Sequence, residues 1–254
     1  MPLVATEAIV LHAFNYLESS RIVRLATREA GLVSVVARGA RRPRSAFGSL
    51  DLFSHGIAQI SMRPHRDLHT LTGFDVANSR TSLGAALPRF AAATMLIELV
   101  LRFGHEESGR DLFAPLAAGL DLLQRGDDAA GDAALHAAWQ LVGALGFTPT
   151  LDDCASCHDA IPVDESAMFD VRAGGVLCAK CRAALQGSSR RTLPATARDS
   201  IRAWLAGETR SLDSHAVRKA HRRLLREFLA EHLSDGRALT AFATWESVSD
   251  GAES

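Results

Sequence analysis

Residues 154–181 read CASCHDAIPVDESAMFDVRAGGVLCAKC and contain all four cysteines of the 254-residue chain. The cysteines form two C-x2-C pairs, Cys154 with Cys157 and Cys178 with Cys181, with twenty residues between the pairs. A C-x2-C pair brings two thiolates to one side of a tight turn, and a second pair completes a tetrahedral sulfur shell that excludes water and substrate. The spacing therefore predicts one structural site with Zn2+ as its cofactor.

The residues between the two pairs support this prediction. Residues 167–172 and 176–177 are typical of two short strands joined by a turn at Gly174 and Gly175, which would carry the second pair back to the first. Three alternatives stay open: two disulfides, a thioredoxin-like redox pair, and four unrelated buried thiols. We favour zinc because every cysteine lies in one short segment of a chain that we expect to be intracellular.

The composition indicates a globular chain, long enough for two or three compact units. Hydrophobic residues make up 47% and charged residues 22%, which excludes the disordered and fibrous classes. The amino end lacks a basic segment followed by an apolar one, so we expect no secretory signal. The longest apolar run, residues 90–101, contains Glu98 and is too short to cross a bilayer. These features predict a cytoplasmic protein.

The net charge of −1 conceals two basic regions. Residues 1–80 carry ten Lys/Arg against six Asp/Glu, a balance of +4, and residues 187–226 carry ten against three, a balance of +7. The remaining regions are acidic, with balances of −4 for residues 81–150, −3 for 151–186 and −5 for 227–254. The basic regions are suited to a polyanion such as nucleic acid, although runs of Lys and Arg are more often ordinary solvated surface.

Short strands dominate the first eighty residues. The candidate strands are residues 8–12, 21–27, 32–37, 52–62 and 68–76. Five short strands separated by turn residues, with no long helical period, predict a small closed barrel of the OB type. An SH3-like barrel is the nearest alternative.

An arginine-rich loop at residues 38–48 follows the third candidate strand. Gly39 and Pro43 prevent a helix there, so the guanidinium groups stand on an irregular backbone that can follow a phosphate path. OB barrels commonly bind oligonucleotides, and we therefore favour nucleic-acid binding over a merely solubilising loop. The predicted contacts are Arg38, Arg41, Arg42 and Arg44 in the loop, with Arg21, Arg24 and Arg28 before it as weaker candidates.

Aromatic side chains, which stack on the bases of single strands, are few in this region. They are Phe14, Tyr16, Phe47, Phe53 and Phe74. We therefore expect contacts with the nucleic-acid backbone to outweigh contacts with the bases.

From residue 88 the apolar period becomes helical. The predicted helices are residues 90–103, 111–124, 129–145, 194–205 and 215–233, rich in Ala and Leu, as in a helical bundle. Thr192 and Asp213 are the predicted N-caps of the last two helices. His136 and Trp139 are interpreted as packing residues, and residues 246–254 are predicted to form a frayed tail.

The helix predicted at residues 215–233 has a basic face opposite its apolar stripe. At 100° per residue its five cations fall within about 140° of one another, and only Glu227 and Glu231 are available nearby on the helix as partners. The face would contact DNA, receive an acidic peptide or simply be solvated. The cations are Arg218, Lys219, Arg222, Arg223 and Arg226, of which Arg218, Arg222 and Arg223 are the candidate DNA contacts.

Sequence signatures of catalysis are lacking. The chain has no P-loop, no G-x-G-x-x-G opening a βαβ unit and no H-E-x-x-H. A partial match to zinc deaminases fails because Leu177 stands where a proline should precede the C-x-x-C. We therefore expect no enzymatic activity.

The chain resembles the RecO family of recombination mediators in bacterial DNA repair, and the matching segments span most of residues 6–242. They are EAIVL at 7–11, ESSRIVRL at 18–25, VARGARRPRSAFG at 36–48, FD at 169–170, AGGVLC at 173–178 and LLREFLAEHL at 224–233. The resemblance implies an α+β protein with an N-terminal OB domain, a helical domain and a zinc-finger-like insertion. We place these units at residues 1–80 for the barrel, 81–150 and 187–245 for the helical domain, and 151–186 for the zinc module.

The resemblance also implies a function. RecO-like proteins bind single- and double-stranded DNA, anneal complementary strands, and act with RecR and the single-strand binding protein SSB to load RecA. It implies a cytoplasmic, nucleoid-associated protein whose basic helix face binds DNA or the acidic tail of SSB. The alternative is a zinc-bearing transcription or protein-interaction module whose contact with DNA is incidental.

Overall fold

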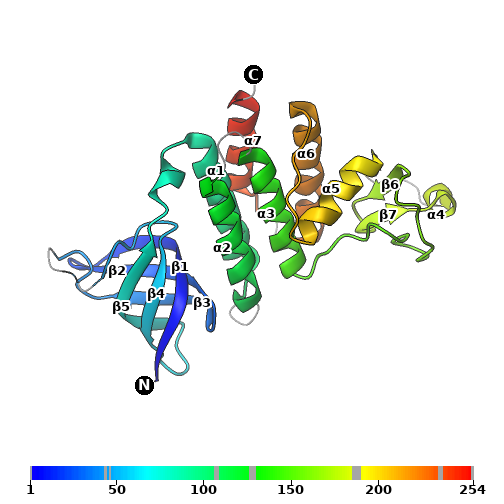
Figure 1. The fold of residues 1–254 in the computed structure, drawn as a ribbon. Helices are drawn as coiled ribbons and strands as arrows, with labels where there is room; N and C mark the ends of the chain where they lie inside the picture. Colours follow the sequence, from blue (N-terminus) through cyan, green and yellow to red (C-terminus); the bar gives the residue numbers. More distant parts are fainter. Residues whose placement is uncertain are drawn as a thin grey trace.

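The computed structural model describes residues 2–42, 45, 47–105, 109–125, 130–184, 190–233 and 237–252. Figure 1 shows a strand barrel at one end of the molecule, helices in the middle, and a small unit containing β6, β7 and α4 at the other end. This arrangement confirms the predicted fold class.

The N-terminal barrel is closed and five-stranded. Its strands are β1 (Leu3–Tyr16), β2 (Ser20–Thr27), β3 (Gly31–Ala37), β4 (His55–Ser61) and β5 (Leu68–Asn78). They are ordered β1-β2-β3-β5-β4, with β3 and β5 parallel and the other pairs antiparallel. The pattern of short strands separated by turn residues in the sequence therefore predicts the barrel correctly.

The barrel strands bury side chains on both faces over part of their length. Val10 and Val35 point into the barrel, whereas Ile9, Leu11 and Leu32 belong to the core that the helices share. The pairing register of β1 with β2 shifts between Val10 and His12, so a β-bulge at Leu11 changes the direction of the strand. The helices therefore cover one part of the barrel's outer surface.

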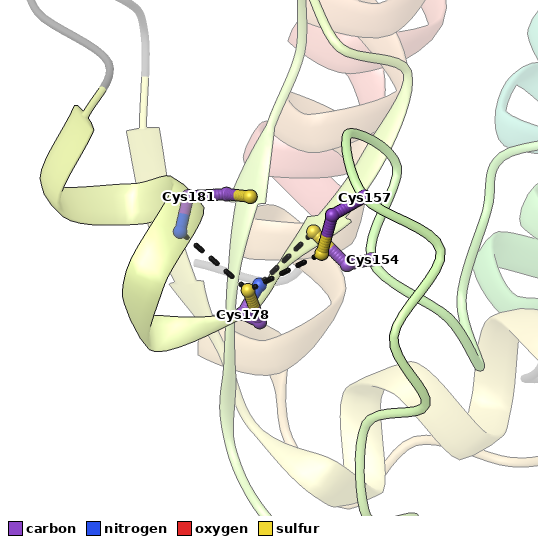
Figure 2. A group of neighbouring side chains, drawn as sticks. All are labelled: Cys154, Cys157, Cys178 and Cys181. Carbon is purple, nitrogen blue, oxygen red and sulfur yellow. Dashed lines mark hydrogen bonds between the residues drawn. The ribbon is translucent and has the colours of Figure 1, made fainter.

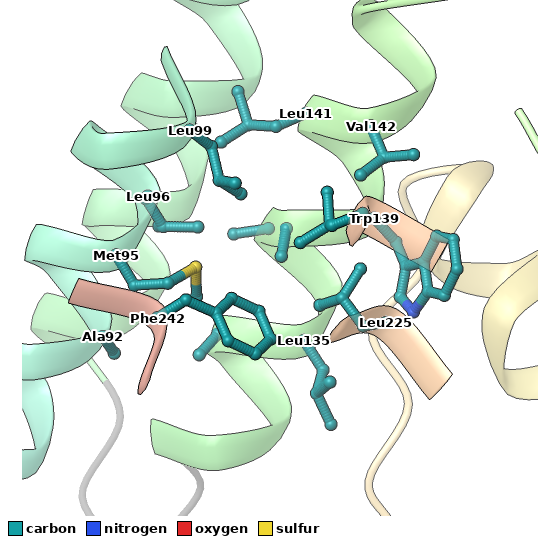
Figure 3. Packing of buried hydrophobic residues seen from close by; sticks show 14 of the residues in the cluster. Ala92, Met95, Leu96, Leu99, Leu135, Trp139, Leu141, Val142, Leu225 and Phe242 are labelled. Carbon is teal, nitrogen blue, oxygen red and sulfur yellow. The ribbon is translucent and has the colours of Figure 1, made fainter. Parts of the chain in front are cut away.

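In the described part of the chain, six longer helices form the middle of the molecule. They are α1 (Leu87–Phe103), α2 (Gly109–Arg125), α3 (Ala130–Ala144), α5 (Ala195–Leu205), α6 (His215–His232) and α7 (Thr240–Ala252), with a short 3-10 helix at Thr81–Gly84. Figure 3 shows their core, where Leu99 of α1, Trp139 of α3, Leu225 of α6 and Phe242 of α7 are buried. Among the described residues no helix has the length and apolarity needed to span a membrane.

A buried arginine links the barrel to the helices. The side chain of Arg80 is fully buried, and its guanidinium lies 2.8 Å from the Asp121 carboxylate of α2 and donates to the carbonyl of Phe53 at 3.1 Å. The Asp121 carboxylate is 40% exposed, but without it the buried guanidinium of Arg80 would lose its ionic partner. Arg80 therefore holds the end of the barrel against α2.

The third unit interrupts the helices, as the sequence predicts. It contains β6 (Ala167–Asp170), β7 (Gly175–Leu177), the short helix α4 (Ala179–Ala184) and β8 (Arg190–Leu193). The strands form one sheet in the order β7-β6-β8. The third strand, β8, is not predicted by the sequence, because its first two residues are arginines and it follows a short polar segment.

Both predicted N-caps are wrong. Thr192 lies within β8, and α5 begins after Pro194 without a side-chain cap. The cap of α6 is Ser214, whose hydroxyl accepts a hydrogen bond from the amide of Val217 at 3.3 Å. Ser214 has the extended backbone that a capping residue needs, and it lies one residue beyond the predicted Asp213.

The predicted frayed tail is also wrong over residues 246–252, which belong to α7. The carboxylate of Glu98 on α1 accepts hydrogen bonds from the amides of Thr240 and Phe242 at 2.8 and 3.0 Å, and so caps the first turn of α7. Further along, the Asp250 carboxylate lies 2.6 Å from the guanidinium of Arg222. These partners come from other helices, so the local composition of the tail does not reveal them.

A buried histidine makes the stability of the helical unit depend on pH. His221 of α6 is 3% exposed, its ring packs edge-on against Trp204, and neither ring nitrogen hydrogen-bonds to another described group. Burial lowers its pKa to about 4 from the usual 6.5. Between pH 6.5 and pH 4 this histidine is protonated in the unfolded chain but stays neutral in the folded chain. The free energy of unfolding therefore falls as the pH drops below 6.5.

We predict that His221→Leu removes this dependence. The histidine alone should reduce the free energy of unfolding by about 2 kcal/mol between pH 7 and pH 5. Urea unfolding at the two pH values would show a smaller loss in His221→Leu than in the parent chain. Equal losses in the two proteins would contradict the assignment.

Candidate nucleic-acid surface and metal site

The four cysteines meet in space, as their spacing predicts. Figure 2 shows Cys154 and Cys157 facing Cys178 and Cys181, and all four sulfur atoms lie within 4.8 Å of one another. All four are free thiols, and the sulfurs of Cys157 and Cys178 are 3.7 Å apart. A tetrahedral shell with metal–sulfur bonds of 2.3 Å has sulfur–sulfur edges of about 3.8 Å, whereas a disulfide bond is about 2.05 Å long. The geometry fits a shared metal ion and not disulfides.

Backbone amides donate hydrogen bonds to two of the four sulfurs, and cysteine binds metals as the thiolate. The amide of Cys178 donates to the sulfur of Cys154 at 3.3 Å, and the amide of Cys181 donates to the sulfur of Cys178 at 3.5 Å. Burial raises the pKa of Cys154, but hydrogen bonds from neighbouring amides and from Cys157 outweigh it and lower the pKa to about 6. At Cys157 a backbone hydrogen bond at Asp159 lowers the pKa, but burial and hydrogen bonds with the other three sulfurs raise it to about 12. Among these thiols, the surroundings therefore favour the thiolate at Cys154 in particular.

The cysteine unit is fixed to α6 by its sheet. The ring of Phe169 on β6 lies 6.2 Å from that of Phe228, and the Arg191 guanidinium of β8 donates to both carboxylate oxygens of Glu227. Hydrogen bonding to Arg191 lowers the pKa of Glu227. An aromatic contact and a two-pronged ion pair therefore attach the unit to one helix.

Gly174 and Gly175 are required by the backbone geometry. Gly174 has a φ of +72°, a conformation that side-chain-bearing residues rarely adopt. At Gly175 a Cβ would stand 2.3 Å from the carbonyl oxygen of Thr150, because residue 150 bridges to the start of β7. The Gly-Gly element thus lets the second cysteine pair return beside the chain that leads into the first.

We predict that Gly175→Ala destabilises the chain by roughly 1–3 kcal/mol, because the new methyl group would overlap backbone atoms. Gly84→Ala is the matched control, since nothing lies within 4 Å of a Cβ at that position. Urea unfolding of both variants tests the prediction. A Gly175→Ala protein as stable as Gly84→Ala would contradict the close approach of Thr150.

The arginine loop after β3 leaves two of its cations without ion-pair partners. Arg38 and Arg42 are exposed, and neither forms an ion pair within the described part of the chain. Arg41 is also exposed, but its guanidinium donates to the carbonyl of Glu18 at 3.0 Å in the β1–β2 turn. Arg44, also predicted to contact nucleic acid, lies outside the described residues.

The three arginines before the loop, predicted as weaker nucleic-acid contacts, lie in different surroundings. Arg24 stands on β2, half-buried and with no ion pair among the described residues. Arg21 lies 3.8 Å from the carboxylate of Asp51. Arg28 follows the end of β2, pairs with Glu7 and lies over the ring of Phe113 on α2 at 4.8 Å. Arg28 therefore belongs to the contact between barrel and helices, whereas Arg24 faces outward.

The cations of α6 are paired within the molecule. Arg222 is 1% exposed and bonded to Asp250, so phosphate cannot reach it without rearrangement. Their carboxylate partners come from α3 and α7 as well as from α6, which is why the helix sequence alone suggests a free basic face. The pairs are Arg218 with Asp132, Lys219 and Arg222 with Asp250, Arg223 with Glu227, and Arg226 with Glu246.

A groove of about 710 Å³ runs between β8, α5 and α6. Apolar side chains line it, including those of Leu193, Ala197 and Val217, and the last is 37% exposed. Lys219 and Arg223 also line the groove. An apolar groove with cationic side chains is suited to an acidic peptide that also carries apolar residues.

Two family models together cover most of the chain. Residues 1–80 match the model described as Recombination protein O N terminal, and residues 85–239 match Recombination protein O C terminal. The boundary between them falls where the barrel gives way to the helices. The sequence and the architecture therefore divide at the same place.

Curated relatives agree with the family models. The chain is 37% identical over 254 residues to the DNA repair protein RecO of Anaeromyxobacter sp. (strain K), covering 95% of each chain. It is 31% identical over 242 residues to that of Nocardioides sp., covering 93% of this chain and 97% of the relative. These similarities place the chain among the proteins of DNA repair and recombination. Within that class, it belongs to the RecO family.

Proposed function

We propose that this chain is a non-enzymatic recombination mediator that binds single- and double-stranded DNA and anneals complementary strands. In this proposal it acts in the cytoplasm, on the nucleoid, with RecR and SSB to load RecA. Membership of the RecO family supports a role in DNA repair and recombination. The observation that carries the DNA-binding step is the exposure of Arg38 and Arg42, which have no ion-pair partners among the described residues.

The proposed contacts are with phosphates. Arginines on an irregular loop can approach the phosphates of one or two strands, releasing counterions and lowering the repulsion between strands that must pair. Binding of this kind falls steeply with salt and depends little on base sequence. We assign it to the barrel and give Arg218 and Arg222 of α6 a structural role, because they are paired with Asp132 and Asp250.

The groove between α5 and α6 is the proposed docking site for the acidic tail of SSB. Its apolar lining would receive apolar side chains of the tail, and Lys219 and Arg223 would lie beside its carboxylates. The sequence allows the basic face of α6 either to bind DNA or to bind an acidic peptide, and this assignment gives it the peptide. DNA binds at the barrel, and the protein partner binds at the opposite part of the molecule.

The proposed metal is zinc, held by Cys154, Cys157, Cys178 and Cys181 in a structural role. Four thiolates at these separations suit its tetrahedral geometry, and a closed sulfur shell contributes to folding and not to catalysis. The acidic balance of −3 over residues 151–186 makes the unit a poor DNA-binding finger. Its attachment to α6 supports a role in shaping the helical domain.

We predict that the double variant Arg38→Ala, Arg42→Ala binds DNA more weakly and anneals strands more slowly. Losing two phosphate contacts should make the salt dependence of single-strand binding shallower by about 1.4 in logarithmic slope. The control is Arg172→Ala with Arg210→Ala, which removes two exposed arginines far from the barrel. Anisotropy titrations at several salt concentrations and a fluorescence annealing assay, with and without SSB, provide the measurements.

Unchanged affinity in the barrel variant, with intact circular dichroism, would contradict the loop assignment. A protein that forms a salt-resistant partner complex but never anneals DNA would instead support the alternative function, a zinc-bearing protein-interaction module.

We predict about one zinc ion per purified chain, lost in Cys154→Ser. Removing the metal should lower the melting temperature while leaving affinity for DNA nearly unchanged, because the cysteine unit lies away from the barrel. Elemental analysis and thermal unfolding, with and without a chelator, test this. Disulfides in place of metal, or loss of DNA binding without unfolding, would refute it.

A further inference from the structure

We propose that the outer surface of β1 and β2 stacks the unpaired bases of single-stranded DNA through a row formed by His12, Phe14 and Tyr16. The proposal rests on the proposed function and adds to it a source of preference for single strands. The three residues alternate along β1 after the bulge at Leu11, so their side chains leave the same face of the barrel. We call them the aromatic row.

The aromatic row is exposed. The side chain of Phe14 is 45% exposed and that of Tyr16 is 41% exposed, although large apolar surfaces are usually buried. His12 is also exposed, and its ring centroid lies 5.7 Å from that of Phe14. Before the bulge, the outer residues Ile9 and Leu11 are covered by the helical core. The bulge therefore marks the point where the outer face of β1 becomes open to a ligand.

A cation stands beside the row. His12 pairs in register with Arg24 of β2, and Phe14 pairs with Ile22, so these side chains share the outer face. Arg24 has no ion pair among the described residues. An aromatic ring beside a guanidinium is the arrangement that binds a base next to its own phosphate.

The arginine loop continues this surface. The amide of Arg41 donates to the carbonyl of Ser19 at 3.1 Å, and its guanidinium donates to the carbonyl of Glu18, so the loop lies against the turn that follows Tyr16. The aromatic row, Arg24 and the loop thus form one continuous surface. The exposed or half-buried residues that β1 and β2 contribute along the row include no carboxylate: they are His12, Phe14, Tyr16, Ile22 and Arg24. The positive charge of Arg24 and of the loop favours a polyanion over an acidic protein partner.

Only an unpaired strand can use the aromatic row. Alternate residues of a strand stand about 6.8 Å apart, twice the rise of roughly 3.4 Å between successive bases in a duplex. A strand must therefore be unstacked to place bases on the row, and in a duplex the base faces are covered by their neighbours. Duplex DNA is left with the phosphate contacts of the loop, which gives the surface its preference for single strands.

The barrel sequence does not show the row by composition alone. Of its few aromatics, Phe53 and Phe74 are buried at 3% and 1% exposure. Alternation along β1 places Phe14 and Tyr16 on one face with His12, and the structure shows that this face is exposed. From the sequence we expect mainly contacts with the nucleic-acid backbone. The proposal adds a second set of contacts, which the aromatic row makes with the bases.

The test compares oligo-dT with an abasic strand of equal length and charge. The variant Phe14→Leu, Tyr16→Leu keeps apolar bulk but removes the ring faces, and Ile57→Ala, which is exposed on β4, is the control. The parent chain should bind oligo-dT at least tenfold more tightly than the abasic strand. The variant should lose most of this difference while keeping its affinity for duplex and its salt dependence, with unchanged circular dichroism.

Several results would overturn the proposal. If the variant at Phe14 and Tyr16 lost affinity for oligo-dT and for duplex DNA equally, the row would serve folding or general DNA binding. If the parent chain bound oligo-dT and the abasic strand with equal affinity, base stacking would be excluded. Unchanged oligo-dT binding with loss of a protein partner would assign the row to protein docking. A parent chain that bound no DNA would contradict the proposed function and this inference with it. Loss of oligo-dT affinity in the variant at Arg38 and Arg42, with none in the variant at Phe14 and Tyr16, would support the proposed function and contradict the inference.

Discussion

The contact between the outer face of the barrel and the helices determines what the rest of the surface can do. The hydrophobic core of the helices includes three side chains from the outer face of the barrel, those of Ile9, Leu11 and Leu32. The approach is close enough that a Cβ on Gly109, the first residue of α2, would stand 2.6 Å from the amide nitrogen of Leu32. One side of the barrel is therefore closed, and the β-bulge at Leu11 turns the remainder of β1 toward solvent. Aromatic and cationic side chains gather on that open side.

Ion pairing within the fold explains why we assign DNA binding to one of the two basic regions and not to the other. The region from 187 to 226 has the larger balance, +7, yet the cations of α6 are matched by carboxylates of α3, α6 and α7. The barrel region has the smaller balance, +4, but keeps Arg24, Arg38 and Arg42 without ion pairs among the described residues. Net charge of a segment is therefore a weaker guide to polyanion binding than the pairing of its cations in the fold.

The sequence predicts features that depend on neighbours along the chain. Short strand-like runs separated by turn residues predict the barrel, and the C-x2-C spacing predicts that four thiols meet, because strands and turns of a few residues fix both. It does not predict that Asp250 pairs with Arg222 or that Glu98 caps α7, since each involves residues far apart in sequence. The helical end of the chain and the paired cations of α6 follow from those distant partners.

We propose that single-stranded DNA lies on the open side of the barrel, and hydrogen–deuterium exchange of the full chain, with and without an oligo-dT strand, can locate it. We expect slower exchange in residues 12–24 and 34–42 on binding, with little change in α6 or the cysteine unit. Protection confined to α5 and α6, with the barrel unaffected, would contradict it.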